Sequence, residues 1–134
     1  MRVFLDTNVI VSALTARGLS ADVFRLTVAE HELLTGEVNL KKLRRVLRLR
    51  MRVPARQMDE IEQLMREHTI TPIPEKLPDI ELRDPDDKWV LASAVVGAAD
   101  VLVTGDKDLL SSMDAAPLPI LTPRAFWESL RQRR

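Results

Sequence analysis

The chain has 134 residues, of which 46% are hydrophobic and 30% charged, and its 20 basic residues balance its 20 acidic ones. This length fits a single domain over residues 1–134, whose folding can bury roughly two-thirds of the surface of the unfolded chain. The absence of cysteine excludes disulfides and thiolate metal sites, and no apolar run has the length of a membrane span. No signal-peptide pattern is visible, so we expect a cytoplasmic protein.

Short apolar segments alternate along the chain with longer segments in which apolar residues recur at steps of three and four. The segments expected as strands are residues 2–5, 32–35, 70–73, 101–104 and 120–121. The segments expected as helices are residues 7–14, a helix capped by Ser20, and residues 37–49, 56–68, 88–98 and 123 onward. This alternation predicts a three-layer α/β/α sandwich around a central, mainly parallel sheet. Prolines around residues 70–73 indicate an edge strand or a surface connection.

Acidic residues follow two of the expected strands and open one of the expected helices. They are, in chain order, Asp6, Asp84, Asp86, Asp87 and Asp106. Each alone has an ordinary explanation, because aspartate is a preferred N-cap and complements the helix dipole. Right-handed crossovers, however, place all of these positions near one edge of the sheet. Acids from three distant segments repel one another there unless a proton or a cation neutralises them, and Mg²⁺ and Mn²⁺ favour carboxylate ligands.

Three blocks of this sequence resemble the signature blocks of PIN-domain proteins, and most closely those of the toxin–antitoxin branch, the VapC-like ribonucleases. The blocks are Leu5-Asp6-Thr7-Asn8-Val9, Arg83-Asp84-Pro85-Asp86-Asp87-Lys88 and the segment from Leu102 to Leu110. Residues 120–126 also resemble that branch, so the likeness runs in order along nearly the whole chain. The resemblance implies a PIN-like α/β/α fold, Mg²⁺- or Mn²⁺-dependent cleavage of RNA phosphodiesters, and a role as the toxin of a toxin–antitoxin pair.

Carried over by position, the resemblance assigns the catalytic and metal-binding roles to three carboxylates. These are Asp6, Asp87 and Asp106. The positions that would support them, by orienting the acids or the attacking water or by sharing the metal, are Thr7, Asn8, Asp84, Asp86, Thr104 and Asp108. A carboxylate-held metal lowers the pKa of bound water and stabilises charge that develops on the phosphate, so the implied chemistry agrees with the clustering of acids.

One position departs from the family pattern. Where the family usually has a glutamate in the helix after the second strand, this chain has Lys42, and Glu37 is too far upstream to replace it unless the helix begins differently. The site could bind one metal through its aspartates and stay active, or Lys42 could contact phosphate or neutralise the acids and leave little activity. The lysine could also be an engineered change. The alternative function is therefore an inactive PIN-like domain that binds RNA or a protein partner.

Positive charge is concentrated between Lys41 and Arg56, where eight basic residues occur without an acid. A solvated helix face is the ordinary explanation, but attraction of phosphates explains the run at least as well and predicts salt-sensitive binding. The candidate RNA-binding residues are Lys41, Lys42, Arg44, Arg45 and Arg48. By resemblance, the partners are an antitoxin that blocks the site and a second copy in a homodimer. Trp89 and Trp127 are expected to pack in the core or at a dimer contact, not to stack on bases.

Overall fold

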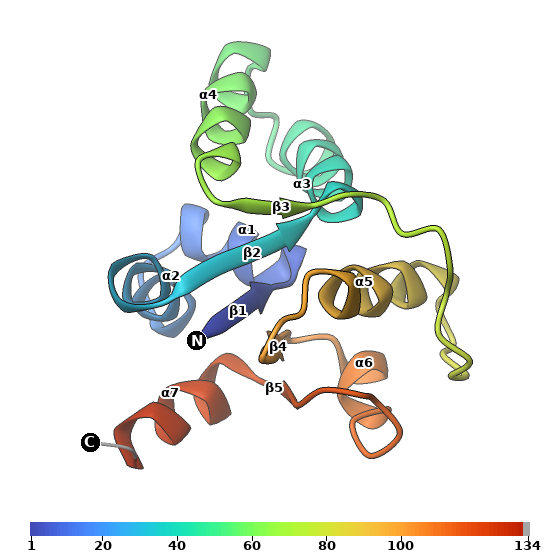
Figure 1. The fold of residues 1–134 in the computed structure, drawn as a ribbon. Coiled ribbons are helices and arrows are strands. Elements are labelled where there is room, and N and C mark those ends of the chain that lie inside the picture. Colours follow the sequence, from blue (N-terminus) through green and yellow to red (C-terminus); the bar gives the residue numbers. More distant parts are fainter. Residues whose placement is uncertain (133–134) are drawn as a thin grey trace.

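The computed structural model describes residues 1–132 and has an all-parallel sheet flanked by helices (Figure 1). In these residues the strands are β1 (Arg2–Leu5), β2 (Glu32–Gly36), β3 (Thr69–Thr71), β4 (Val101–Val103) and β5 (Ile120–Leu121). They lie in the order β3-β2-β1-β4-β5. The predicted α/β class is confirmed, and β3 forms an edge of the sheet, as the neighbouring prolines indicated.

The helices of residues 1–132 lie close to the expected segments, with bounds that differ by up to three residues, except for the short α6, which was not expected as a helix. They are α1 (Thr7–Thr15), α2 (Leu19–Glu30), α3 (Glu37–Leu49), α4 (Ala55–Arg66), α5 (Pro85–Val96), α6 (Lys107–Ser111) and α7 (Pro123–Gln132). The expected Ser20 cap is wrong, because α2 begins at Leu19 and its N-cap is Gly18, two residues before Ser20. α5 begins at Pro85 because proline needs no hydrogen-bond partner in a first helical turn, and Asp84 caps it. None of the helices within residues 1–132 has the length and apolarity to cross a membrane.

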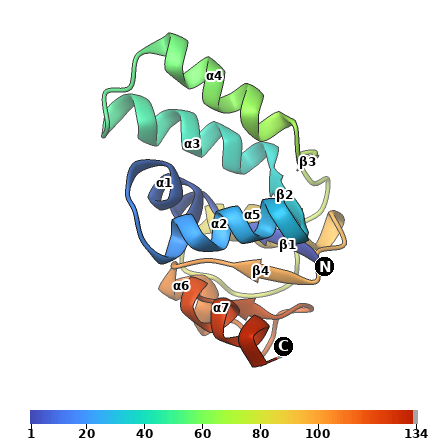
Figure 2. The same ribbon diagram turned by 90° about the vertical axis from the view of Figure 1, so that its left-hand side faces the viewer.

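The two faces of the sheet carry separate apolar cores, because successive side chains of a strand point to opposite faces. Val3 and Leu5 of β1 belong to a core shared with α1, α2, α3, α4 and α7. Phe4, between them, belongs to a second core shared with α5 and α6. Figure 2 shows α2 in front of the sheet and α5 behind it. The sheet is therefore the middle layer of three.

The strand order reverses next to β1. The chain passes from β1 to β2 and β3 on one side of the sheet, and then returns to place β4 and β5 on the other side. The backbone N–H of Asp6 donates to the carbonyl of Val103 at 3.0 Å, so the ends of β1 and β4 are adjacent. In open α/β sheets, ligands bind at such a switch point, outside the carboxyl ends of the strands. The fold therefore places the predicted acids where a ligand site is expected.

Candidate functional site

Asp6 is the centre of a buried hydrogen-bond network at the end of β1, and the residue is only 4% exposed. Its Oδ1 accepts hydrogen bonds from the Thr7 N–H at 2.7 Å and from Asn39 Nδ2 at 3.1 Å. Its Oδ2 accepts a third hydrogen bond from Thr104 Oγ1 at 2.7 Å. A carboxylate offers about four acceptor positions, so these donors fix the orientation of Asp6 and leave a position on Oδ2 for a ligand.

Asn39 is a site residue that the sequence-based prediction missed. It lies in the first turns of α3, is 1% exposed, and its Nδ2 donates to both Asp6 Oδ1 and Thr7 Oγ1 at 3.1 Å. Close packing requires glycine nearby, since a Cβ on Gly36 would lie 3.0 Å from Asn39 Oδ1. The available signal was position: Asn39 is a polar residue four before Leu43, on the apolar side of a helix.

Thr104 connects Asp6 to the segment that follows β4. Its buried hydroxyl donates to Asp6 and accepts from the backbone N–H of Asp106 at 3.0 Å. Asp106 is the N-cap of α6, as its ordinary structural explanation predicted. Asn8, which is exposed, accepts from the N–H of Gly105 at 3.2 Å. The predicted supporting residues Thr104 and Asn8 therefore join the two segments that carry Asp6 and Asp106.

Asp87 lies in the first turn of α5 and is 2% exposed, and its Oδ2 has no hydrogen-bond partner in the described part of the chain. Burial, then a hydrogen bond with Asp108 and the charges of Asp106, Asp84 and Asp108, raises the pKa of Asp87 to about 8. Asp108 accepts from the backbone N–H groups of Asp84 and Arg83, and chiefly the Asp84 N–H lowers the pKa of Asp108. Near neutral pH, Asp87 is therefore the protonated acid of the pair and Asp108 is the ionised one.

The structure brings the three predicted acids into electrostatic contact. Burial raises the pKa of Asp6, hydrogen bonds from Thr104 and Thr7 oppose the rise, and the charge of Asp106 adds to it. The charge of Asp106 also raises the pKa of Asp87, so Asp106 interacts electrostatically with both other acids. Among residues 1–132, however, no three carboxylate, histidine or cysteine side chains are arranged to ligate one ion. The acids are gathered without forming a closed metal cage.

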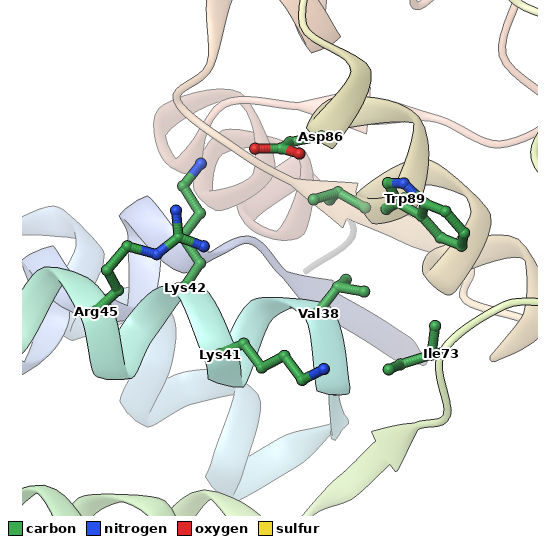
Figure 3. Close-up of a pocket in the computed structure, with 8 residues that line it drawn as sticks. Val38, Lys41, Lys42, Arg45, Ile73, Asp86 and Trp89 are labelled. Atoms are coloured by element: carbon green, nitrogen blue, oxygen red, sulfur yellow. The ribbon is translucent and has the colours of Figure 1, made fainter.

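Lys42 extends from α3 toward these acids, and Figure 3 shows its side chain directed toward Asp86. Its positive charge opposes the burial that raises the pKa of Asp6. Glu37 does not replace the missing glutamate, because it forms a two-point ion pair with Arg66 of α4 at 2.8 and 3.0 Å. The hydrogen bond from Arg66 is the main reason that the pKa of Glu37 is lowered. The site thus contains Lys42 at the position where the sequence resemblance led us to expect an acid.

A pocket of about 260 Å³ opens between α3 and α5 beside the acids (Figure 3). It is lined by Val38, Lys41, Lys42, Arg45, Ile73, Asp86, Trp89 and Val90. A groove along α3 and α4 shares Lys41 and Arg45 with this pocket and adds Arg48. Arg44 differs from the other candidate RNA-binding residues, since it pairs with Asp59 at 2.7 Å and Glu62 at 3.2 Å on α4. Its charge is therefore already used in holding the two helices together.

The chain belongs to the PIN-domain family, because a PIN-domain model matches residues 2–108. Its structure is similar to that of VapBC2 from Rickettsia felis bound to a promoter DNA fragment, with 17% identity, a TM-score of 0.63, and 90% of this chain and 97% of that chain covered. VapBC-1 from nontypeable Haemophilus influenzae is also similar, with 14% identity, a TM-score of 0.63, and 92% of this chain and 99% of that chain covered. A toxin–antitoxin complex from Klebsiella pneumoniae has 16% identity and a TM-score of 0.63, with 90% of this chain and 97% of that chain covered. These identities show a shared fold alone. No protein of curated function matches the chain by sequence.

The raised pKa of Asp87 predicts a pH-dependent stability of the metal-free protein. Its pKa is about 8 in the folded chain against an ordinary value of 3.8, so the folded state retains a proton that the unfolded state releases between these values. Stability therefore falls as pH rises through this window. Urea unfolding at several pH values measures this. Between the low and the high end of the pH window, the free energy of unfolding of Asp87→Asn should rise by more than about 1 kcal/mol relative to that of wild type. Parallel profiles of the two proteins would contradict the assigned pKa.

Asn39→Ala should lower the free energy of unfolding by about 1.5–3 kcal/mol, because it removes a hydrogen bond to a buried charged group. Asn8→Ala is the matched control, since Asn8 is an exposed asparagine at the same edge and should cost less. Urea unfolding at neutral pH measures both. Equal losses in the two variants would show that Asn39 does not fix Asp6.

Proposed function

We propose that this chain is a metal-dependent ribonuclease that cleaves RNA phosphodiesters and acts as the toxin of a toxin–antitoxin pair. The observation that carries the proposal is the crowding of Asp6, Asp87 and Asp106 at the switch point of the sheet. A PIN-domain sequence and a fold shared with toxin–antitoxin structures support it. The basic face of α3, formed by Lys41, Lys42, Arg45 and Arg48, favours a polyanionic substrate.

The donor set fits Mg²⁺ or Mn²⁺. Asp6 retains an acceptor position on Oδ2, and Asp87 Oδ2 is buried without a hydrogen-bond partner in residues 1–132. Asp6 and Asp87 would hold the ion, with Asp106 adding negative charge. Mg²⁺ usually keeps several waters and binds one or two carboxylates plus substrate phosphate, so a closed protein cage is not required. A bound ion would supply an activated water and offset charge developing on the phosphate.

The chain's own residues would keep the acids and the RNA in place. Thr104, Asn39 and the Thr7 N–H hold Asp6 in one orientation before substrate arrives. Asp108 binds the backbone at the start of α5 and so positions Asp87. Lys41, Lys42, Arg45 and Arg48 would bind RNA phosphates, whereas we leave out the paired Arg44. An antitoxin that covers this face would inhibit the enzyme. Two copies of the chain would form a homodimer.

A second candidate function is an inactive PIN-like domain that binds RNA or a protein partner. The observation that favours it is Lys42, whose charge acts on Asp6 and so competes with a cation. Both candidates use the basic face of α3, and they differ only in whether the acids bind a metal. Metal binding and cleavage are therefore the measurements that separate them.

Purified wild-type protein with Mn²⁺ should cleave single-stranded RNA, and Asp6→Asn should reduce the rate at least about 100-fold, because it weakens the electrostatic stabilisation of the reaction. Gel assays of cleavage and calorimetric titration with Mn²⁺ measure the two effects. Asp114→Asn, at an exposed position outside the site, is the control and should behave as wild type. Absence of Mn²⁺ binding at millimolar concentration would reject the metal site.

Lys42→Glu should increase Mn²⁺ affinity and the cleavage rate at saturating RNA, because it replaces a competing cation with a further carboxylate at the acid cluster. Arg48→Glu makes the same change of charge farther along α3 and controls for the general field of the helix. Calorimetric titration with Mn²⁺ compares the two variants with wild type. Equal effects, or none, would mean that Lys42 does not occupy the position of the family's glutamate.

A further inference from the structure

We infer that the pocket between α3 and α5 holds one unpaired base of a single-stranded RNA, stacked on Trp89, while cations of α3 bind the adjacent phosphates. This inference rests on the proposed function, because it assigns a substrate subsite beside the proposed acids. It reverses the expectation from the sequence that Trp89 packs in the core or at a dimer contact and does not stack on bases.

The walls of the pocket suit a flat, apolar group. Figure 3 shows Trp89 on α5, with Val38 of α3 and Ile73 of the segment after β3 on the opposite side. Trp89 is half-buried, so its indole remains available to a ligand. The volume of about 260 Å³ lies below the roughly 300–1,000 Å³ that is typical of drug-sized ligands. The pocket therefore fits one planar ring system better than several consecutive side chains of a peptide.

The charge at the pocket favours a nucleic acid. Lys41, Lys42 and Arg45 line it, and none of the three forms an ion pair with another residue in the range 1–132. This contrasts with Arg44, whose guanidinium is bound by two acids of α4. Unpaired cations beside a half-buried aromatic ring that lines a pocket match the pattern by which proteins bind single strands, with stacked bases and neutralised phosphates.

The basic surface continues beyond the pocket, as a chain of nucleotides requires. Lys41 and Arg45 line both the pocket and the neighbouring groove, where Arg48 follows one turn later on α3. At the other side, Lys42 and Asp86 belong to the pocket and adjoin the acid cluster. A base on Trp89 would thus place one flanking phosphate toward the acids and the others along α3. An unpaired base is needed, because a base within a duplex cannot stack on a protein side chain.

The test compares binding of ribo-oligonucleotides with binding of an abasic oligonucleotide of the same length and charge. Binding is measured by fluorescence anisotropy with the full chain, in chelator, so that no cleavage occurs. Wild type should bind the base-bearing oligonucleotides about tenfold more tightly, which is the size of one stacking interaction. Trp89→Ala should abolish this preference and Trp89→Phe should keep most of it. Trp127→Phe, on α7, is the matched control and should leave the preference unchanged.

The cations supply an independent arm. Arg45→Ala should weaken binding of both oligonucleotides and lower the salt dependence by about one unit, whereas Arg124→Ala on α7 should not. Unchanged base preference in Trp89→Ala, with circular dichroism showing a folded protein, would overturn the inference. So would quenching of Trp89 fluorescence by an acidic peptide but not by RNA, which would assign the pocket to a protein partner. A Trp89-dependent preference without Mn²⁺-dependent cleavage would support the pocket and reject the nuclease. Mn²⁺-dependent cleavage without a Trp89-dependent base preference would support the nuclease and reject the base pocket.

Discussion

The site depends on holding several carboxylates together in spite of their mutual repulsion. The protein does this mainly with neutral donors, which orient an acid without cancelling its charge. Asp6 accepts from Thr7 of α1, from Asn39 of α3 and from Thr104 of the segment after β4. Asp108 in turn accepts from two backbone N–H groups at the start of α5. Because these donors belong to the ends of parallel strands and the starts of helices, the sheet topology and the acid cluster depend on each other.

Lys42 changes the charge balance of this cluster. A site with four acids would retain a large negative charge after binding one divalent cation, and would favour a second. With Lys42 in place of one of them, the three proposed ligand acids and the lysine carry a net charge that a single divalent ion would offset, while Asp84 and Asp108 keep the surroundings negative. The proton on Asp87 reduces the charge of the metal-free site further, since burial, Asp108 and the neighbouring acids raise its pKa to about 8. Under the proposed function, this charge balance would favour one metal ion whose remaining positions are filled by water and substrate.

The sequence predicted most of what depends on local pattern. Alternating strands and helices determined the fold class, and residues at strand ends and helix starts identified the acid cluster. It did not reveal contacts between segments far apart in the chain. Asn39 has the ordinary sequence appearance of a helix residue, and only the packing of α3 against α1, whose N-cap is Asp6, brings it to Asp6. In the same way, nothing local distinguished the paired Arg44 from the unpaired Arg45, because the partners of Arg44 lie on α4.

α3 connects the acids with the surface proposed to bind RNA. Its buried side orients Asp6 through Asn39, and its exposed side lines the pocket with Lys41, Lys42 and Arg45. Lys42 takes part in both, since its charge counteracts the burial that raises the pKa of Asp6. An acidic segment bound along α3 would therefore act twice: it would occupy the phosphate sites and offset the lysine charge that helps keep Asp6 ionised. Substrate binding and inhibition by an acidic partner would then compete for the same face of one helix.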